Sequence, residues 1–287
     1  MEPSYFKVGK GVSCIEWGRD QPWKIERSAL SVYHYKKLNY IPTSLREEAI
    51  KAAKLIPDDC FVAMSGGVDS ETIAQLFLDI GKPFTALSLD FGINSEDLRY
   101  ARKWCKDNKV RHIVIGKEYL QLATSIFLNY RPMGMTIHGA TRCWLAHRFQ
   151  PIVFGDGDME FLKDGTLMEN DYAFGPLVLA NHTDSQNYNF WAMTSELQYM
   201  FIDGPEANNK YVRYQEIHPT VEHRKSLHGL EELEGSTLWS LWGQSNPITP
   251  RHMIYESAEK FQEELIKGDI IVKSDFEDRM TGQVQTF

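Results

Sequence analysis

The residues most able to do chemistry form one short loop, SGGVDS at residues 65–70. The loop follows the continuous apolar run CFVAM, and helical spacing resumes directly after it. Its two glycines let the backbone approach a ligand closely, its serines add hydroxyl donors, and the amino terminus of a helix carries partial positive charge. The pattern predicts an anion site of the kind that holds phosphate oxygens.

Asp69 is the unusual residue of this loop. A carboxylate inside a phosphate site is unfavourable unless a cation lies between the two negative groups. We therefore expect Mg²⁺ between Asp69 and a pyrophosphate group. A plain glycine turn with a serine or aspartate helix cap is the alternative. We favour the phosphate site because a strand, a loop and a helix follow one another in the order that it requires.

The hexapeptide SGGVDS resembles the PP-loop of the N-type ATP pyrophosphatase superfamily, which includes asparagine, GMP and NAD synthetases and several tRNA-modifying enzymes. The resemblance spans roughly residues 58–170. It implies cleavage of ATP between the α- and β-phosphates; the lysine of a Walker A loop is absent. It also implies that ATP and Mg²⁺ are bound by the whole loop: Ser65, Gly66, Gly67, Val68, Asp69 and Ser70.

The next apolar run ends in LSLDF at residues 87–91, which resembles the segment that lies against adenine and ribose in these enzymes. The resemblance implies that Leu89 and Asp90 contact the nucleoside, with Asp90 bonding the ribose. An aspartate that ends a strand is as often a simple turn former, and this alternative stays open.

A third segment, residues 152–160, resembles the S-G-x-G-x-D-E loop of asparagine synthetases. The resemblance implies that Gly155 and Asp156 bind the nucleotide and that Asp158 holds Mg²⁺ together with Asp69. The chain departs from the pattern at Asp156, which is an added residue. A glycine turn with solvated acidic side chains is the alternative.

Three basic residues are candidates for binding the phosphates. Arg142 falls where several superfamily members place an arginine near the triphosphate, and a guanidinium gives a bidentate contact that is always charged. Arg224 and Lys225 lie in the basic stretch HRKSLHG and could neutralise departing pyrophosphate. A surface arginine and a solvated basic loop are the respective alternatives.

The elements around these residues alternate between apolar runs and segments of helical spacing. This alternation predicts an α/β fold, a doubly wound parallel sheet with right-handed crossovers. The expected strands are 60–64, 84–91, 111–116 and 151–156. The expected helices are 43–56, 71–81, 95–109, 118–130, 139–149 and, near the end of the chain, 255–268.

The chain is predicted to divide into three parts. Residues 1–56 form an irregular or β-rich amino-terminal segment that packs on the core, and residues 57–180 form the ATP-binding domain. Residues 181–287 form a less regular region that covers the carboxyl ends of the strands and binds the second substrate.

The composition narrows the classes of partner. A formal charge of −8 over 287 residues disfavours non-specific electrostatic binding of nucleic acid. A tRNA substrate remains an alternative. The four cysteines show no paired spacing, which fits a reducing, cytoplasmic setting. We expect no membrane span and no secretory signal.

These observations favour an adenylating ligase that activates a small-molecule carboxylate and lets ammonia or an amine displace AMP. Met1 is followed by Glu2, so the nucleophile of a glutaminase is absent and the nitrogen is expected from a separate glutaminase or amine donor. One alternative is a tRNA- or nucleobase-modifying enzyme that activates a carbonyl. The other is a nucleotide-binding module without turnover.

Overall fold

The structure of the chain is a computed structural model. It describes residues 4–6, 15–19, 30–90, 94–116, 144–155, 159–161, 166–169, 186–202, 210–221, 253–254 and 258–275.

The central element is a parallel sheet of five strands. Its strands, in spatial order, are β10 (Asn187–Asn189), β7 (Ile152–Phe154), β4 (Cys60–Ala63), β5 (Phe84–Leu89) and β6 (His112–Ile115). Every neighbouring pair is parallel. The chain enters at β4, extends through β5 and β6 to one edge, and then returns to build β7 and β10 on the other side. This is the doubly wound order, which confirms the predicted fold class.

Both faces of this sheet are covered, which explains the continuous apolar run in β4. Cys60 and Val62 belong to one buried cluster, whereas Phe61 and Ala63 pack against a second cluster on the opposite face. Successive side chains of a strand point to opposite faces, so a strand covered on both sides needs apolar residues at every position.

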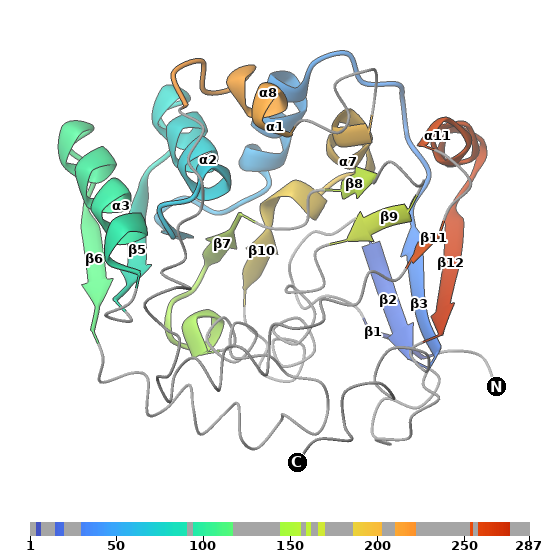
Figure 1. Ribbon diagram of the computed structural model, residues 1–287, viewed down its shortest axis with the longest axis horizontal. Coiled ribbons are helices and arrows are strands. Elements are labelled where there is room, and N and C mark those ends of the chain that lie inside the picture. Colours follow the sequence, from blue (N-terminus) through green and yellow to red (C-terminus); the bar gives the residue numbers. More distant parts are fainter. Residues whose placement is uncertain are drawn as a thin grey trace.

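Three predicted helices pack on the first of these faces (Figure 1). They are α1 (Leu45–Lys54), α2 (Val68–Asp79) and α3 (Ser95–Asp107). Ser44 caps α1 by accepting a hydrogen bond from the Glu47 amide, and Gly81, with φ of 68°, follows α2 in the left-handed conformation. The opposite face is covered by residues 144–149, of which 144–148 are helical. The predicted helix 118–130 lies outside the described residues.

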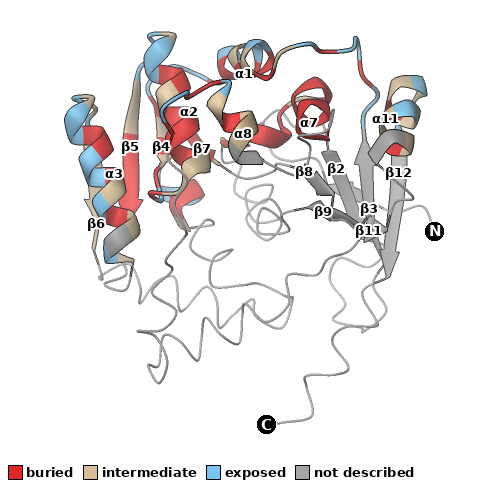
Figure 2. Cartoon of the chain, turned by 45° about the horizontal axis from the view of Figure 1, so that its top comes forward, coloured by how far each residue is buried: buried red, intermediate tan, exposed pale blue. Residues whose placement is uncertain are grey.

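The first face is completed by elements that the sequence does not predict. They are η4 (Phe190–Ala192), α7 (Ser195–Ile202) and α8 (Lys210–Gln215). All residues of α7 are buried, and Figure 2 shows this helix in the colour of buried residues. A helix that is buried all round has no polar stripe, so it lacks the periodic signal by which a surface helix is recognised.

A second sheet pairs the two ends of the described chain. β1 (Ser4–Phe6), β2 (Ile15–Arg19), β3 (Leu30–Tyr35) and β12 (Ile270–Asp275) form an antiparallel sheet in this order. Residues of the predicted amino-terminal segment therefore pair directly with residues of the predicted carboxyl-terminal region.

The remaining elements complete the carboxyl-terminal part. A smaller antiparallel sheet joins β8 (Met159–Phe161), β9 (Thr166–Glu169) and β11 (Met253–Ile254). The predicted late helix is present as α11 (Ala258–Lys267). Because β10 lies beyond residue 180, the parallel sheet extends past the predicted end of the ATP-binding domain.

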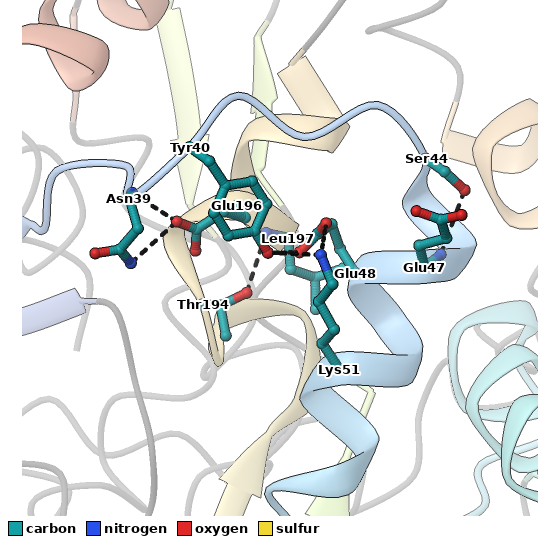
Figure 3. A network of polar contacts seen from close by, with 9 residues as sticks. All are labelled: Asn39, Tyr40, Ser44, Glu47, Glu48, Lys51, Thr194, Glu196 and Leu197. Carbon is teal, nitrogen blue, oxygen red and sulfur yellow. Dashed lines mark hydrogen bonds and ion pairs between the residues drawn. The ribbon is translucent and has the colours of Figure 1, made fainter.

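A polar network fastens the connection between β3 and α1 to the rest of the protein (Figure 3). The Tyr40 hydroxyl donates to Glu48 Oε2 at 2.6 Å, and Lys51 Nζ lies 2.8 Å from Glu48 Oε1. The Asn39 amide and side chain both donate to Glu196 of α7. Glu48 and Glu196 are buried, so these partners offset the cost of removing both carboxylates from water.

No helix within the described residues has the length and apolar character that crossing a membrane requires.

The core predicts the outcome of one pair of substitutions on α2. Phe77 is fully buried and meets Phe84 and Phe190 edge to face, whereas Leu78 is 36% exposed. We expect Phe77→Ala to lower the free energy of unfolding by about 3–5 kcal/mol, because it leaves a cavity in the core. The matched substitution Leu78→Ala should lower the free energy of unfolding clearly less, because Leu78 is partly exposed. Urea unfolding of both variants measures the difference, and equal losses would contradict the packing described.

Candidate functional site

The loop that the sequence singles out is closed by its own serine hydroxyls. The Ser65 amide donates to Ser70 Oγ and the Gly67 amide donates to Ser65 Oγ, each at 3.2 Å. Ser70 Oγ in turn donates to the Gly67 carbonyl at 3.1 Å. Gly67 is the N-cap of α2 and makes no side-chain cap hydrogen bond. A serine or aspartate helix cap, the alternative for this loop, is therefore not what the structure shows.

Gly66 must be a glycine for two independent reasons. Its φ is 95°, in the left-handed region that residues with a side chain rarely adopt. A Cβ at this position would also lie 1.9 Å from the carbonyl oxygen of Asp97 in α3. The backbone of the loop thus passes directly against the first turns of α3.

Two side-chain oxygens lie beside the position that a side chain on Gly67 would take. A Cβ on Gly67 would lie 3.3 Å from Ser65 Oγ and 4.0 Å from Asp69 Oδ2. A side chain at residue 67 would crowd Ser65 Oγ, whereas glycine leaves this position unfilled. A hydroxyl and a carboxylate beside one position match the pairing of a metal with a polyphosphate.

Gly155, the described residue of the second predicted loop that follows β7, lies against the first loop. Gly155 follows β7, and a Cβ on it would lie 3.0 Å from the Ser70 amide nitrogen and 3.3 Å from Asp69 Cβ. β4 and β7 are the neighbouring strands at which the winding of the sheet reverses, and ligands of such sheets bind outside the strand ends at this point. The structure therefore brings Gly155 together with Asp69 and Ser70, three residues that the sequence analysis assigns to the nucleotide site, and their role in binding stays a prediction.

Five other predicted site residues lie outside the described residues. They are Arg142, Asp156, Asp158, Arg224 and Lys225. Their roles stay predictions.

Leu89 and Asp90 lie at the end of β5, next to β4. The Leu89 carbonyl accepts a hydrogen bond from the Asn94 side chain at 2.8 Å, and the Leu89 side chain packs on the cluster at the second face. The Asp90 amide donates to the Ile115 carbonyl, and its carboxylate forms an ion pair with Arg102 at 3.5 Å. This pair is partly exposed, so Asp90 is accessible from the carboxyl edge of the sheet.

A buried polar network that the sequence did not reveal supports the start of the loop. Ser88 Oγ donates to the carbonyl of Met64, the residue directly before Ser65. Its only proton is used there, so Ser88 must accept from Nε2–H of His112, which lies 2.8 Å away. Burial, reinforced by the positive charge of Arg102, lowers the pKa of His112 and favours the neutral ring.

Tyr214 is the other site residue that the sequence did not reveal. Its hydroxyl donates to Asp69 Oδ1 at 2.6 Å, although 145 positions separate the two residues. The surrounding stretch KYVRYQ carries no spacing that could have indicated this contact. Only folding brings α8 to the first turn of α2.

The two cysteines that the structure describes are not candidates for nucleophiles. Burial raises the pKa of the Cys60 thiol to about 11 and that of the Cys105 thiol to about 12. A thiolate is the reactive form, so both thiols are inert near neutral pH.

The donor set around Asp69 fits Mg²⁺ that is shared with a substrate. No group of three His, Cys, Asp or Glu side chains capable of holding a metal occurs among the described residues. Mg²⁺ commonly binds through one or two carboxylates plus substrate phosphates, with water completing its octahedron. Asp69, whose Oδ2 lies 4.0 Å from the position that a Cβ on Gly67 would take, supplies one such carboxylate.

No protein-family model matches the chain. No curated protein matches it either.

The solved structures that resemble it weakly include two synthetases. NMN synthetase from Francisella tularensis is 16% identical, with a TM-score of 0.31, and the alignment covers 73% of this chain and 99% of that one. NH3-dependent NAD synthetase from Campylobacter jejuni subsp. jejuni NCTC 11168, in complex with the nitrate ion, is 16% identical, with a TM-score of 0.32. That alignment covers 78% of this chain and 90% of the other. TM-scores this low assign neither a fold nor a function.

The loop geometry predicts that Gly66→Ala disrupts nucleotide binding. The added methyl group must displace backbone of α3, so we expect ATP affinity to fall about tenfold or more, equivalent to about 1.4 kcal/mol. Gly81→Ala is the matched control, since Gly81 also has positive φ but no atom lies within 4 Å of its added Cβ. That variant should lose stability while keeping its affinity for ATP. Titration calorimetry measures both, and unchanged binding by the Gly66 variant would contradict this loop conformation.

The network at Ser88 predicts a pH dependence of stability. The pKa of His112 is below its ordinary 6.5 in the folded protein, so the unfolded chain binds the proton more readily. Stability should therefore decline as pH falls through about 6.5, and His112→Gln should remove part of that decline. Urea unfolding at several pH values between about 8 and about 5.5 compares the two slopes. Identical slopes would exclude this role for His112.

Proposed function

We propose that this chain is an ATP-dependent adenylating ligase of the PP-loop kind. In this proposal it binds ATP and Mg²⁺ at residues 65–70, cleaves ATP to AMP and pyrophosphate, and activates a small-molecule carboxylate for amidation by ammonia or an amine. The nitrogen comes from a separate glutaminase or amine donor.

The observation that carries the proposal is the contact between the two strand-end loops. Gly155 lies directly against Asp69 and Ser70, at the reversal point of a doubly wound sheet. Two glycine-containing backbones and the start of α2 thus converge on one position, which suits a ligand rich in anionic oxygens. The carboxylate of Asp69 at the same position supports a metal-bound polyphosphate over a simple anion.

The reaction proceeds in two steps that this chain's residues would support. An oxygen of the acceptor carboxylate attacks the α-phosphorus, the bond from that phosphorus to the bridging oxygen breaks, and pyrophosphate leaves. The amine then attacks the acyl carbon and AMP leaves. The backbone of Gly66 and Gly67 and the hydroxyls of Ser65 and Ser70 orient the phosphates for the first step.

Negative charge develops on the phosphates during the reaction, so cations near the loop would stabilise the transition state. Mg²⁺, held by Asp69 and by Asp158, would stabilise the negative charge that develops on the phosphates. Arg142, Arg224 and Lys225 would bind the departing pyrophosphate, and Leu89, Asp90 and Asp156 would contact the nucleotide. These assignments rest on the sequence resemblance.

The choice of a carboxylate acceptor rests on two observations. Residues 152–160 resemble the corresponding loop of asparagine synthetases. In addition, the high pKa values of Cys60 and Cys105 disfavour these thiols as carriers for sulfur transfer to a nucleobase.

The decisive experiment is incubation of the purified protein with Mg²⁺, α-labelled ATP and pooled cell metabolites. AMP together with pyrophosphate and a mass-shifted amide would support the proposal and identify the acceptor. A modified nucleobase or tRNA would indicate the nucleobase-modifying enzyme instead. ADP, or binding without turnover, would refute adenylation.

Removing the charge of Asp69 should abolish this activity. Asp69→Asn keeps the size of the side chain but not the metal-binding charge, so we expect AMP formation to fall at least about 100-fold. Asp107→Asn is the control, because Asp107 is an exposed carboxylate paired only with Lys103 among the contacts described for it. Circular dichroism checks that both variants fold. AMP release by the Asp69 variant at the wild-type rate would refute the site.

A further inference from the structure

The Tyr214 ring is held rigidly in the core. It is fully buried, and its centroid lies 5.0 Å from that of Trp191 and 5.9 Å from that of Phe201. A ring packed on two sides has little freedom to turn, so its hydroxyl keeps one position. That hydroxyl donates to Asp69 Oδ1 at 2.6 Å, which is within the roughly 2.5–2.7 Å expected of a hydroxyl bound to a carboxylate.

The segment that carries Tyr214 is fastened to its neighbours by two further contacts. His218 Nε2 lies 3.3 Å from Glu71 Oε1 of α2, and both side chains are buried. Arg46 of α1 donates to the Ile217 carbonyl at 2.9 Å. Figure 2 shows α8 lying beside α2, in agreement with these contacts. These contacts dock residues 210–221 on α1 and α2, whereas the position of the Tyr214 hydroxyl is set by the packing of its own ring against Trp191 and Phe201.

The hydrogen bond decides which way the Asp69 carboxylate faces. With Oδ1 bound to Tyr214, Oδ2 lies toward Gly67, 4.0 Å from the position that a Cβ there would take. Ser65 Oγ borders the same position at 3.3 Å. Rotation about the bond between Cβ and the carboxyl carbon would carry Oδ2 away from this space. A donor fixed at Oδ1 opposes that rotation.

We propose that Tyr214 is a positioning residue for the carboxylate of Asp69, holding Oδ2 toward the side of Gly67 and Ser65 Oγ, where Mg²⁺ and pyrophosphate would bind. This inference rests on the proposed function. Tyr214 acts through Asp69 and touches neither metal nor nucleotide. A carboxylate already aimed at the metal loses no rotational freedom on binding, so the hydroxyl raises metal affinity.

The test uses Tyr214→Phe, which keeps the ring and removes only the hydroxyl. We expect the affinity for Mn²⁺, measured by electron paramagnetic resonance with α,β-methylene-ATP, to fall about 10- to 100-fold. The Mg²⁺ concentration that gives half-maximal AMP formation should rise by a similar factor. Affinity for the analogue without metal should stay the same. Unchanged Mn²⁺ affinity in the folded variant would overturn the inference.

Two further variants separate positioning from packing. His218→Gln loosens the same segment without touching Asp69, so its Mn²⁺ affinity should remain near that of the wild type. If His218→Gln loses as much Mn²⁺ affinity as Tyr214→Phe, the inference is overturned, since looser docking of residues 210–221 would then explain the loss in both variants. If Tyr214→Phe does not fold, 4-fluorophenylalanine at position 214 fills the space of the hydroxyl without donating. Its folded form should reproduce the loss, and retained affinity would overturn the inference.

The readouts also separate this inference from the proposed function. A wild-type chain that makes AMP, with unchanged Mn²⁺ affinity in Tyr214→Phe, would leave the function standing and the inference wrong. A wild-type chain that binds Mn²⁺ with the analogue but makes no AMP would refute the function, while the comparison of affinities still decides the role of Tyr214. A wild-type chain that holds no Mn²⁺ with the analogue would overturn both.

Discussion

The candidate site depends on a close approach of backbones that only residues without a side chain permit. Gly66 lies against the Asp97 carbonyl of α3, and Gly155 lies against the first turn of α2. A methyl group at Gly66 would have to displace main chain, and one at Gly155 would crowd it. These contacts place the loop after β4, the loop after β7 and the start of α2 within reach of one ligand.

The rest of the fold keeps that arrangement rigid. β4 is central in the sheet and packed on both faces. Its continuation at Met64 is held by two residues of β5, because the Met64 amide donates to the Leu87 carbonyl and the Met64 carbonyl accepts from Ser88 Oγ. His112 supports Ser88 from β6. The polar groups beneath the loop are therefore satisfied by neighbouring strands, which leaves the loop conformation little freedom to change.

The carboxyl-terminal half of the chain does not only cover the carboxyl ends of the strands, as the sequence predicted for residues 181–287; it also contributes residues to both larger sheets and to the candidate site. It supplies β10 to the parallel sheet, β12 to the antiparallel sheet and Tyr214 to Asp69. The Asp69 carboxylate of the proposed site thus accepts a hydrogen bond from Tyr214 of α8, an element that is distant in sequence. Folding of the two halves and the geometry of the site are coupled through this contact.

The sequence by itself determined the loop, its flanking strand and helix, and the alternation that leads to a doubly wound sheet. These features are local, because glycine spacing, apolar runs and helical periodicity act over a few residues. It also assigned Gly155 to the nucleotide site through a resemblance of motifs, but the contact of Gly155 with Asp69 and Ser70 came from the tertiary structure. The tertiary structure alone decided that Asn187–Asn189 becomes a strand, since its polar sequence is extended only by pairing with β7. The tertiary structure also decided that the Tyr214 hydroxyl donates to Asp69 and that His112 contacts Ser88, which in turn donates to the Met64 carbonyl. Contacts between distant segments follow from packing, so they leave no local pattern in the sequence.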